Sequence, residues 1–582
     1  MPAPTSSQKW VFIVWTLLLV SIECNSKTIN LKDAAYFIRA WGVLKYYSPL
    51  SERGKVDVDA IFLKHISIVL KPHTKEEFNA ELNSMCSDYG GNKRARSARA
   101  ELMPLGHFFS WIQDSAVGCT AVIDQLLNIA SRSAKKNEYY ARRNWMPGTV
   151  TFRNEQVASE ADLPDAGTRL LALARFWNII NYYDPYTNLF DENWEDVLPQ
   201  AIIRFVNSDK ALSYQLAVVW LTTRINDGHS VTWSPFLRDS VWGPYHPLFE
   251  AEYIEGQTVI RRRIDMHEKV LKPGVIILQV DGKTTKQIRD SLIDYISASN
   301  EVSRQLKANW ALGSGKDTIL TLKILNGADT MLVKATRVKG QKLYEKGMEC
   351  MQKEISYLDL KGDLAYLNIG TITNSQLRKL RKSIIHKRIL IVDLRSYPLH
   401  HPLYKLAKIT NTKWVTYARF QRPSPRHPGL FADDCPYFCG KRSKMGKKFN
   451  GKLILLVNEC TGSQGETTAM ALQASGRAIT LGSQTAGTNG NVAYILLPGR
   501  IHTSFSGLGV TYPDGTQTQR VGIKVDIIVK PTIKGISEGR DELLEKALEI
   551  CKSNTSYFPA KATLQAGEKP GKESDPPGKT DH

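Results

Sequence analysis

The sequence predicts a multidomain α/β protein, with an N-terminal helical region, a β-rich module and a C-terminal layered α/β core. Three observations support this prediction. The chain has 582 residues, whereas single hydrophobic cores rarely grow beyond about 250 to 300 residues. Apolar residues recur with helical spacing up to residue 224, and short β-like runs follow between residues 247 and 338. From residue 355 onward buried strands alternate with helical stretches, which favours helices packed on a sheet.

Composition indicates a globular protein, because 42% of the residues are hydrophobic and 9% are aromatic. The formal net charge of +20 could indicate a nucleic-acid partner. Lysine and arginine are instead spread along the chain without an aromatic-interleaved basic motif, and the dense run at residues 93–99 is typical of a solvated face. We therefore expect no nucleic-acid partner, and no motif calls for a cofactor.

The N-terminus is typical of a secretory signal peptide over residues 1–26. Lys9 precedes an apolar run at residues 10–22, and the small residues Cys24 and Ser26 follow. The run is short for a membrane span. We expect an exported protein, periplasmic or extracellular, without a stable membrane span after signal removal. The alternative is an uncleaved N-terminal anchor that keeps the protein at a membrane.

Export makes the cysteines candidates for disulfides. Seven remain after residue 26, so at least one thiol is free or pairs between chains. Cys435 and Cys439 could close a small loop, and no second pair with ligand spacing accompanies them. A local disulfide, or no bond between the two cysteines, is favoured over zinc, and no metal site is expected.

Two helical units are predicted at residues 27–86 and 164–240, with a loop-rich insertion or linker at 87–163. Residues 39–49 return as residues 175–185 with Arg, Trp, Tyr-Tyr and Pro at matching positions, an offset of 177 − 41 = 136. Two copies indicate a duplicated helical unit, since a solenoid needs at least three repeats.

The next module is predicted at residues 241–340, where β-like runs surround a helical segment at residues 288–300. The strand and turn at residues 274–284 resemble a PDZ-like module, a fold that captures peptide ends at a sheet edge. The glycine-rich carboxylate-binding loop of such modules is not evident, so the resemblance concerns the fold.

The α/β core is predicted at residues 350–552. Its buried strands are expected at 364–369, 389–393 and 453–457, and an amphipathic helix at 539–550 closes it. Residues 553–582 are rich in Pro, Gly, Lys, Glu and Ser, so we expect a disordered tail.

Ser463 stands between the strand at 453–457 and a helix that follows, where a serine nucleophile would be expected. The first free N–H groups of the helix would face negative charge developing beside it. The alternative is that Ser463 is an ordinary helix N-cap. A second candidate is His229, which follows Asp227-Gly228 at a helix-to-strand junction; most turn histidines have no chemical role.

In chain order, these features resemble the C-terminal processing (tail-specific) peptidases and their tricorn-core relatives, over about residues 165–550. The order is a helical region, the turn ending at Ser230, the PDZ-like module, Asp393-Leu-Arg, Ser463-Gln-Gly-Glu466, residues 482–487 and residues 522–526. The resemblance implies serine peptidases with a ClpP/crotonase-like α/β catalytic core.

The resemblance implies that Ser463 attacks the peptide carbonyl. Many members activate this serine with a lysine 25 residues downstream, where this chain has Thr488 (488 − 463 = 25). Threonine cannot act as that base at neutral pH. Tricorn-like members use a histidine from the turn before the PDZ-like module, and His229 occupies the comparable place, with a suitable unperturbed pKa near 6.5.

The remaining site residues would support this pair. The backbone N–H of Gln464 and one from the Ser396–Tyr397 loop would stabilise the oxyanion. The position of an orienting glutamate in tricorn-like enzymes is taken by Gln519, and other supporting residues are Asp227, Ser230, Glu466 and Thr488.

The predicted function is an exported serine endopeptidase that hydrolyses unfolded or C-terminal segments of polypeptide substrates. The alternative is an inactive family member that binds peptides or ligands outside the cytoplasm. A third interpretation is a basic exported protein that binds anionic cell-surface polymers.

Overall fold

The computed structural model describes residues 29–90, 108–131, 139–144, 148–155, 159–265, 269–424, 427–440 and 449–553. The predicted signal peptide (1–26) and all but the first residue of the predicted tail (553–582) lie outside these ranges. Within the described ranges, no helix is both long and apolar enough to cross a bilayer.

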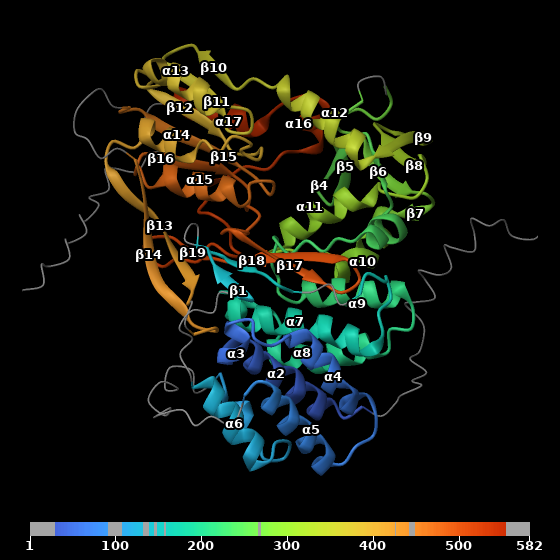
Figure 1. Ribbon diagram of the computed structural model, residues 1–582. Coiled ribbons are helices and arrows are strands. Elements are labelled where there is room, and N and C mark those ends of the chain that lie inside the picture. Colours follow the sequence, from blue (N-terminus) through green and yellow to red (C-terminus); the bar gives the residue numbers. More distant parts are fainter. Residues whose placement is uncertain are drawn as a thin grey trace, which may run out of the picture.

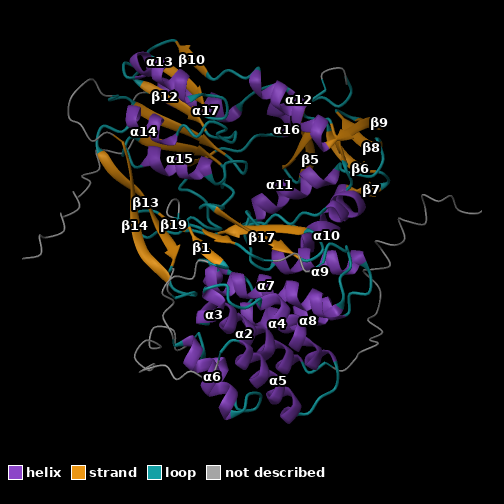
Figure 2. Cartoon of the chain, in the orientation of Figure 1, coloured by secondary structure: helices purple, strands orange, loops and turns teal. Residues whose placement is uncertain are grey.

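The chain folds into three parts that surround a β-hairpin (Figure 1). Helices form the lower part of the view, the α/β core lies at the upper left, and a β-rich module lies at the upper right (Figure 2). The prediction of a multidomain α/β protein with a helical N-terminal region and β-rich parts is confirmed.

The helical region contains two groups of helices and one short two-stranded sheet. The first group comprises α2 (Leu31–Tyr47), α3 (Pro49–Glu52), α4 (Val58–His65), η1 (Ile66–Leu70), α5 (Lys75–Asp88), η3 (Ser110–Gln113) and α6 (Thr120–Ala130). The sheet is formed by β1 (Ala141–Arg143) and β2 (Val150–Phe152). The second group comprises α7 (Ala166–Tyr183), η4 (Thr187–Leu189), α8 (Trp194–Val206), α9 (Ala211–Thr223) and the π-helix η5 (Leu237–Trp242).

The sequence repeat corresponds to a repeated structure. In the first copy, the indole N–H of Trp41 on α2 donates to the carbonyl of Val58, the first residue of α4, at 2.9 Å. In the second copy, Trp177 on α7 donates to the carbonyl of Trp194, the first residue of α8, at 3.0 Å. The equivalent residues of the two bonds differ by 136 positions, so the duplicated unit is a helix anchored on the start of a second helix.

The two copies also exchange ion pairs. Arg39 of the first copy pairs with Glu195 of the second at 2.8 Å. The equivalent arginine of the second copy, Arg175, pairs with Asp59 of the first at 2.7 Å. The offset is again 136, because 39 + 136 = 175 and 59 + 136 = 195. This reciprocal exchange holds the two copies together as one helical body.

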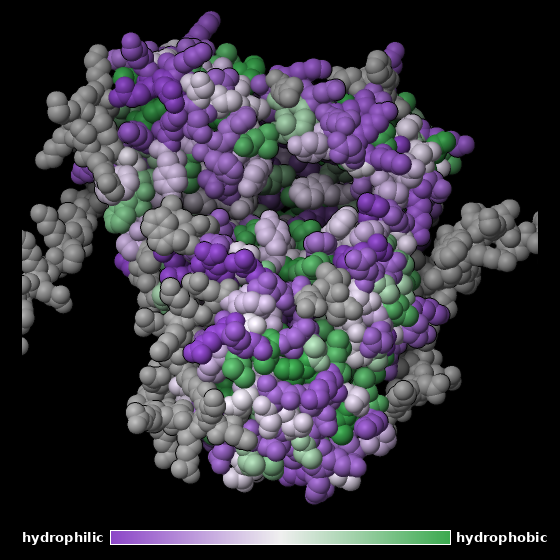
Figure 3. Space-filling model, in the orientation of Figure 1, coloured by the Kyte–Doolittle hydropathy of each residue, from purple (hydrophilic) through white to green (hydrophobic). Residues whose placement is uncertain are grey.

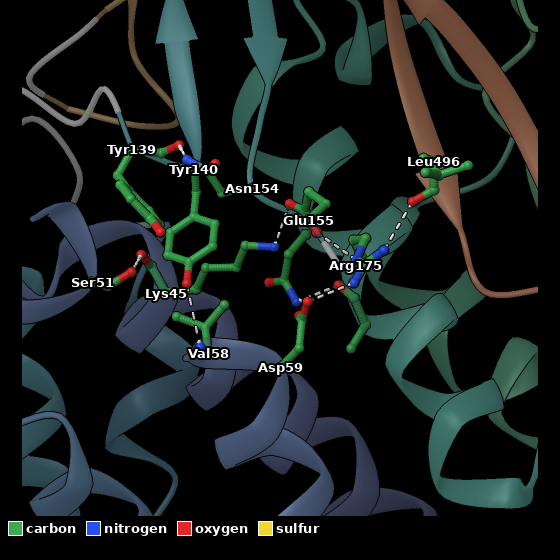
Figure 4. Close-up of polar contacts among 12 residues, drawn as sticks. Lys45, Ser51, Val58, Asp59, Tyr139, Tyr140, Asn154, Glu155, Arg175 and Leu496 are labelled. Carbon is green, nitrogen blue, oxygen red and sulfur yellow. Dashed lines mark hydrogen bonds and ion pairs between the residues drawn. The ribbon is translucent and has the colours of Figure 1, made fainter. Parts of the chain in front are cut away.

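The Arg175 pair belongs to a buried cluster of charges that joins the helices to the hairpin (Figure 4). The Arg175 guanidinium contacts the carboxylates of Asp59 and Glu155 and donates to the carbonyl of Leu496 at 2.9 Å. Lys45 pairs with Glu155 at 2.6 Å, and the side chains of Lys45 and Arg175 are 0% exposed. Two cations and two carboxylates therefore neutralise one another inside the core.

Arg175→Met is expected to destabilise the fold strongly, because it leaves the two buried carboxylates with a single cation. Removing one partner of a buried ion pair costs about 3–5 kcal/mol. The matched control is Arg39→Met, whose partner Glu195 is 56% exposed, and which should cost about 1 kcal/mol. Urea unfolding of both variants measures the difference. Equal losses would contradict this account of the cluster.

The predicted loop-rich stretch at 87–163 is corrected in part. Its described residues contain α6, which has a buried apolar stripe of Val122, Leu126 and Ile129. They also contain β1 and β2. The polar and basic residues around these elements obscured a short amphipathic helix that packs on α2.

The predicted Cys435–Cys439 disulfide is wrong. Both residues lie in strand β14 (Phe431–Gly440), and the Cys439 thiol is free and buried. Four residues of strand span about 13 Å, whereas disulfides need Cα atoms within about 7 Å. The Cys439 thiol instead hydrogen-bonds Asn411 and the carbonyl of Ala471.

The β-rich module is a seven-stranded antiparallel sheet with helices beside it. Its path order is β3-β9-β8-β6-β5-β4, and β7 pairs with β6. The strands are β3 (Tyr245–Pro247), β4 (Phe249–Ile254), β5 (Gln257–Arg263), β6 (Ile276–Val280), β7 (Lys283–Thr284), β8 (Ile319–Asn326) and β9 (Asp329–Lys339). The helices are α10 (Thr285–Leu292), η6 (Ile293–Tyr295), α11 (Glu301–Leu312) and α12 (Gly340–Gln352).

The α/β core is built on a six-stranded sheet whose order is β10-β11-β12-β15-β16-β20. All neighbouring strands are parallel except the pair β10–β11. The strands are β10 (Tyr357–Leu360), β11 (Leu364–Asn368), β12 (Ile389–Asp393), β15 (Lys452–Val457), β16 (Ala478–Gly482) and β20 (Ile527–Ile528).

Helices cover both faces of this sheet. One face packs against α13 (Asn374–Ile384), α14 (Leu403–Thr410) and α15 (Gln464–Gln473). The other face packs against α17 (Glu542–Lys552), which follows the short helix α16 (Ile533–Ser537). A separate three-stranded sheet has the order β14-β13-β19, with β13 (Trp414–Pro423) and β19 (Gly509–Thr511).

The hairpin of β17 (Val492–Leu497) and β18 (Ile501–Ser506) lies between β16 and β20 of the core in sequence but packs in the helical region. Ala493, Ile495 and Phe505 are buried in the same apolar cluster as α2 and α7. The hairpin lies at the centre of the molecule (Figure 1). It therefore connects the helices to the core, and both strands carry residues of the candidate site.

Candidate active site

Ser463 lies at a sharp turn between β15 and α15. Its backbone has φ 51° and ψ −115°, a region that residues other than glycine rarely adopt. Such a conformation costs about 1–3 kcal/mol and persists only where the surroundings enforce it. Ser463 occupies the N-cap position of α15, yet its side chain makes no capping hydrogen bond. The ordinary N-cap role therefore does not account for this serine.

The loop that follows β16 holds the turn in place. The Ser463 N–H donates to the carbonyl of Thr488 at 2.7 Å. Glu466, fully buried on α15, accepts hydrogen bonds from the Thr485 hydroxyl and from the N–H groups of Gly487 and Thr488 at 2.5, 2.8 and 3.0 Å. Burial raises the pKa of Glu466 to about 7, and these donors oppose that shift. Glu466 and Thr488 thus fix the strained turn.

Thr488 also connects the Ser463 turn to the turn that carries His229. Its hydroxyl lies 2.9 Å from the Ser299 hydroxyl. The Ser299 hydroxyl accepts the N–H of Gly228 at 2.8 Å. A Cβ at Gly228 would lie only 2.0 Å from the Thr488 hydroxyl oxygen. Only glycine therefore allows the two turns to approach this closely.

Ser463 lines a cavity of about 650 Å³ in the α/β core. The wall is mainly aromatic and polar, and its residues are Tyr397, His401, Leu403, Tyr404, Tyr417, Phe420, Tyr437, Ser463, Gln464, Thr467, Gly490, Asn491, Val492 and Tyr494. A cavity of this size accommodates several atoms of a peptide beside the Ser463 hydroxyl.

Gln464 and Tyr397 reach this cavity from adjacent strands. Gln464 is the first residue of α15, whose first N–H groups have no partner within the helix. Tyr397 follows β12, which is parallel to β15, so the carboxyl ends of both strands meet at one edge. The Thr461 hydroxyl fixes the two loops together by donating to the carbonyl of Leu394 at 2.9 Å.

His229 is held by a relay of polar groups. Its Nδ1 lies 2.8 Å from the Ser506 hydroxyl, and that hydroxyl donates to Asp227 Oδ1 at 2.9 Å. Because the Ser506 proton is used toward Asp227, the Ser506 oxygen accepts from Nδ1–H. This network assigns the proton of neutral His229 to Nδ1 and leaves a lone pair on Nε2.

The electrostatic environment of His229 favours this neutral form. Burial lowers the pKa of the imidazole, the Asp227 carboxylate opposes the shift, and Lys307 reinforces it. Lys307 comes from α11, and its ammonium donates to the carbonyls of Gly228 and Ser297 at 2.6 and 2.8 Å. Burial also lowers the pKa of Lys307 to about 8.

Asp227 is the centre of the relay. Its carboxylate accepts the N–H of His229 at 3.0 Å, the N–H of Ser506 at 2.5 Å and the side-chain amide of Gln519 at 3.1 Å. Gln519 therefore supports His229 through Asp227, not by contacting the imidazole. The Ser230 hydroxyl donates to the carbonyl of Thr222 and plays no part in the relay.

The Ser463 turn and the His229 turn lie next to each other. Among the described residues, however, the side chains of Ser463 and His229 do not form a hydrogen bond with each other. The connection between the turns is the contact between Gly228 and Thr488, whose carbonyl accepts the Ser463 N–H. The described residues contain no cluster of His, Cys, Asp or Glu that could hold a metal ion.

Sequence reasoning missed three groups near His229: Ser506, Ser299 and Lys307. Ser506 lies on β18 and is separated from His229 by 277 residues. Ser299 precedes the N-cap of α11 and Lys307 lies within this helix, and in the sequence both are ordinary polar positions. No local sequence pattern pointed to these three residues.

A parallel α/β core with a serine at a strained strand-to-helix turn beside a cavity is typical of serine hydrolases of the layered α/β class. Residues 363–529 match the model of Peptidase family S41, and residues 259–336 match the model of the Bacteroidetes, Peptidase, S41 family, N-terminal domain. Two segments of the chain therefore match domains of the S41 peptidases, and the predicted resemblance to this peptidase family is confirmed.

Two solved structures share a similar fold with about two thirds of this chain, and a third has a lower score. The structure of mature CPAF complexed with lactacystin is 12% identical, covers 66% of this chain and 98% of that chain, and has a TM-score of 0.52. Mature CPAF alone is 13% identical, covers 66% and 97%, and has a TM-score of 0.51. The photosystem II D1 C-terminal processing protease is 16% identical, covers 62% and 93%, and has a TM-score of 0.39. A comparison with curated protein sequences gives no match.

Proposed function

We propose that the protein is an exported endopeptidase in which Ser463 is the nucleophile. One observation carries this proposal. Ser463 has a backbone φ of 51°, lines a cavity, and makes no capping hydrogen bond with its hydroxyl. Backbone strain at a residue that lines a cavity is typical of functional sites. The S41 family match agrees with it.

His229 is the general base of this mechanism. With Nδ1–H bonded to Ser506, the Nε2 lone pair takes the Ser463 proton while the serine oxygen attacks the peptide carbonyl. The imidazolium then gives that proton to the leaving amine, and an acyl group stays on Ser463. A water molecule attacks this ester by the same route and regenerates the serine. Ser506 and Asp227 are positioning residues that stabilise the transient imidazolium.

The oxyanion would be stabilised by backbone donors at the edge of the sheet. Gln464 is the first residue of α15, so its N–H lies at the N-terminus of the helix. The partial positive charge of that helix end favours a developing oxyanion. The N–H of Tyr397 lies in the loop on the neighbouring strand. Loss of one such donor typically reduces kcat by about 100- to 1000-fold.

Unfolded polypeptides are the proposed substrates. In addition to the site residues, the cavity is lined by four aromatic side chains: Tyr404, Tyr417, Phe420 and Tyr437. Such a wall suits an apolar or aromatic side chain of an unfolded or C-terminal segment. An extracytoplasmic location, periplasmic or extracellular, follows from the signal-like residues 1–26.

Two observations favour a second candidate, an inactive member that binds peptides. Thr488 replaces the lysine of many relatives and is engaged with Ser299. Ser463 and His229 share no hydrogen bond in the described chain. Peptidase action then requires the two turns to close by a small movement when substrate binds, as catalytic hydrogen bonds often tighten only in the complex.

Hydrolysis of an unfolded protein separates the two candidates. The full chain should cleave a reduced, carboxymethylated protein substrate and leave the same protein intact when it is folded. Cleavage products are measured by mass spectrometry. Binding of the unfolded substrate without any cleavage across pH 6 to 9 would establish the inactive binder instead.

A further inference from the structure

One segment of the α/β core has almost no acidic residues to balance its lysines and arginines. Between residues 364 and 432 the sequence has thirteen lysines and arginines and a single acidic residue, Asp393. Asp393 is buried and pairs with Arg395 at 2.6 Å. The surface formed by this segment therefore carries cations without acidic residues of its own.

Two helices of this segment, α13 and α14, lie on the outside of the core. Helices α13 and α14 pack their apolar sides on the same face of the sheet, through Leu377 and Ile384 in α13 and through Leu406 in α14. The start of α13 contacts α14, because Lys405 donates to the carbonyl of Asn374. The opposite sides of both helices face solvent at the upper left of the molecule, where hydrophilic side chains gather (Figure 3).

Several cations of this segment have partners within the protein. Lys387 pairs with Asp359, Arg388 donates to the carbonyl of Cys551, and Arg395 contacts Asp393 and Asp541. Within the described residues, five exposed cations make no hydrogen bond or ion pair: Arg378, Lys379, Lys382, Lys408 and Lys413. We call these five residues the basic face.

An aromatic pair borders the basic face. Trp414 follows Lys413 directly, at the start of β13, and stacks on Phe438 of β14 with ring centroids 5.9 Å apart. The two residues are 40% and 37% exposed. Large aromatic side chains next to lysines are typical of surfaces that sit at the headgroup level of a membrane.

We propose that the basic face and the Trp414–Phe438 pair dock the protein on an anionic lipid bilayer. Lysines and arginines attract the negative headgroups, and the aromatic pair enters the boundary between headgroups and acyl chains. The aromatic pair favours a bilayer over a soluble polyanion. A polyanion binds through charge and needs no aromatic side chains, whereas a bilayer offers them an apolar boundary. Docking through α13 and α14 holds the enzyme beside membrane proteins whose unfolded segments it would receive.

Vesicle sedimentation of the full chain tests the proposal. We expect binding to vesicles with 30% phosphatidylglycerol in 0.1 M salt and a large loss in 0.5 M salt, since screening shortens the reach of charges. An apolar N-terminal segment would bind anionic and neutral vesicles alike, so the difference between the two vesicle types reports the basic face. The triple variant R378E/K379E/K382E should bind anionic vesicles at least about 100-fold more weakly.

The matched control reverses three exposed lysines of the β-rich module and α12, K272E/K334E/K342E, with the same change in net charge. It should keep most of the binding, and thermal unfolding shows that both triple variants are folded. Trp414→Ala should weaken vesicle binding about tenfold and leave heparin binding unchanged. Equal losses in both triple variants, equal binding to neutral vesicles, or binding to heparin and RNA but not to vesicles would each overturn the proposal.

Discussion

Ser463→Ala is expected to reduce kcat for cleavage of an unfolded substrate by about 10⁴-fold or more, because no other oxygen would stand at the turn to attack the carbonyl. Substrate binding should remain, since the cavity wall and its aromatic residues are unchanged. Single-turnover cleavage measures the loss. Ser483→Ala is a suitable control, because its hydroxyl bonds Glu459 and does not line the cavity.

The same position makes a separate prediction about stability. Alanine at φ 51° keeps the backbone strain of Ser463, whereas glycine adopts this conformation freely. Ser463→Gly should therefore be more stable than Ser463→Ala by about 1 kcal/mol, although both are inactive. If Ser463→Ala cleaved the substrate at the wild-type rate, the assignment of the nucleophile would be wrong.

His229→Ala is expected to reduce kcat by about 10³- to 10⁴-fold, because the serine then lacks a base. Ser506→Ala should cost about 10- to 100-fold, since Nδ1–H loses the acceptor that fixes the tautomer. Ser504→Ala is the matched control on the same strand: its hydroxyl donates to the backbone carbonyl of His229 and leaves the imidazole untouched.

The pH dependence follows from the direction of the His229 shift. Burial lowers the pKa of the imidazole below its ordinary 6.5, so the neutral base persists below pH 6.5 and activity falls only as the pH drops through the lowered pKa. The unfolded chain takes up this proton near pH 6.5. The stability that the neutral imidazole contributes is therefore present above pH 6.5 and is lost as the pH falls below it.

Ser506→Ala should change the acid limb of the plot of kcat against pH, and Ser504→Ala should not. A merely structural role of Ser506 would lower kcat at every pH by the same factor and leave the limb in place. An unchanged profile in Ser506→Ala would thus remove Ser506 from the relay, and full activity in His229→Ala would remove the histidine itself.

Local patterns predicted the fold well because each element carries its own signal. The buried strand before Ser463 is an uninterrupted apolar run, and the break at Thr461 and Gly462 places the serine at the turn. The duplicated helices were evident from Trp41 and Trp177. Their exchanged ion pairs were not, because pairing of Arg39 with Glu195 across copies is a property of packing.

The relay around His229 could not be predicted for the same reason. Asp227 and His229 are neighbours in sequence, but Ser506 reaches them only because the hairpin leaves the core and packs on the helices. Gln519 lay at the expected position and yet contacts Asp227, since Ser506 already occupies the side of the imidazole. The local disulfide between Cys435 and Cys439 does not form because both residues lie in one extended strand, which their spacing in the sequence did not reveal.

The central claim is that His229 activates Ser463, and the rate of fluorophosphonate labelling tests it most directly. Only an activated serine reacts, so the wild-type chain should gain one adduct, which peptide mass spectrometry assigns to Ser463. The labelling rate should rise with pH in proportion to the fraction of neutral His229, and labelling should be lost in His229→Ala. An unlabelled wild type, an adduct on another serine, or equal labelling of His229→Ala would contradict the account.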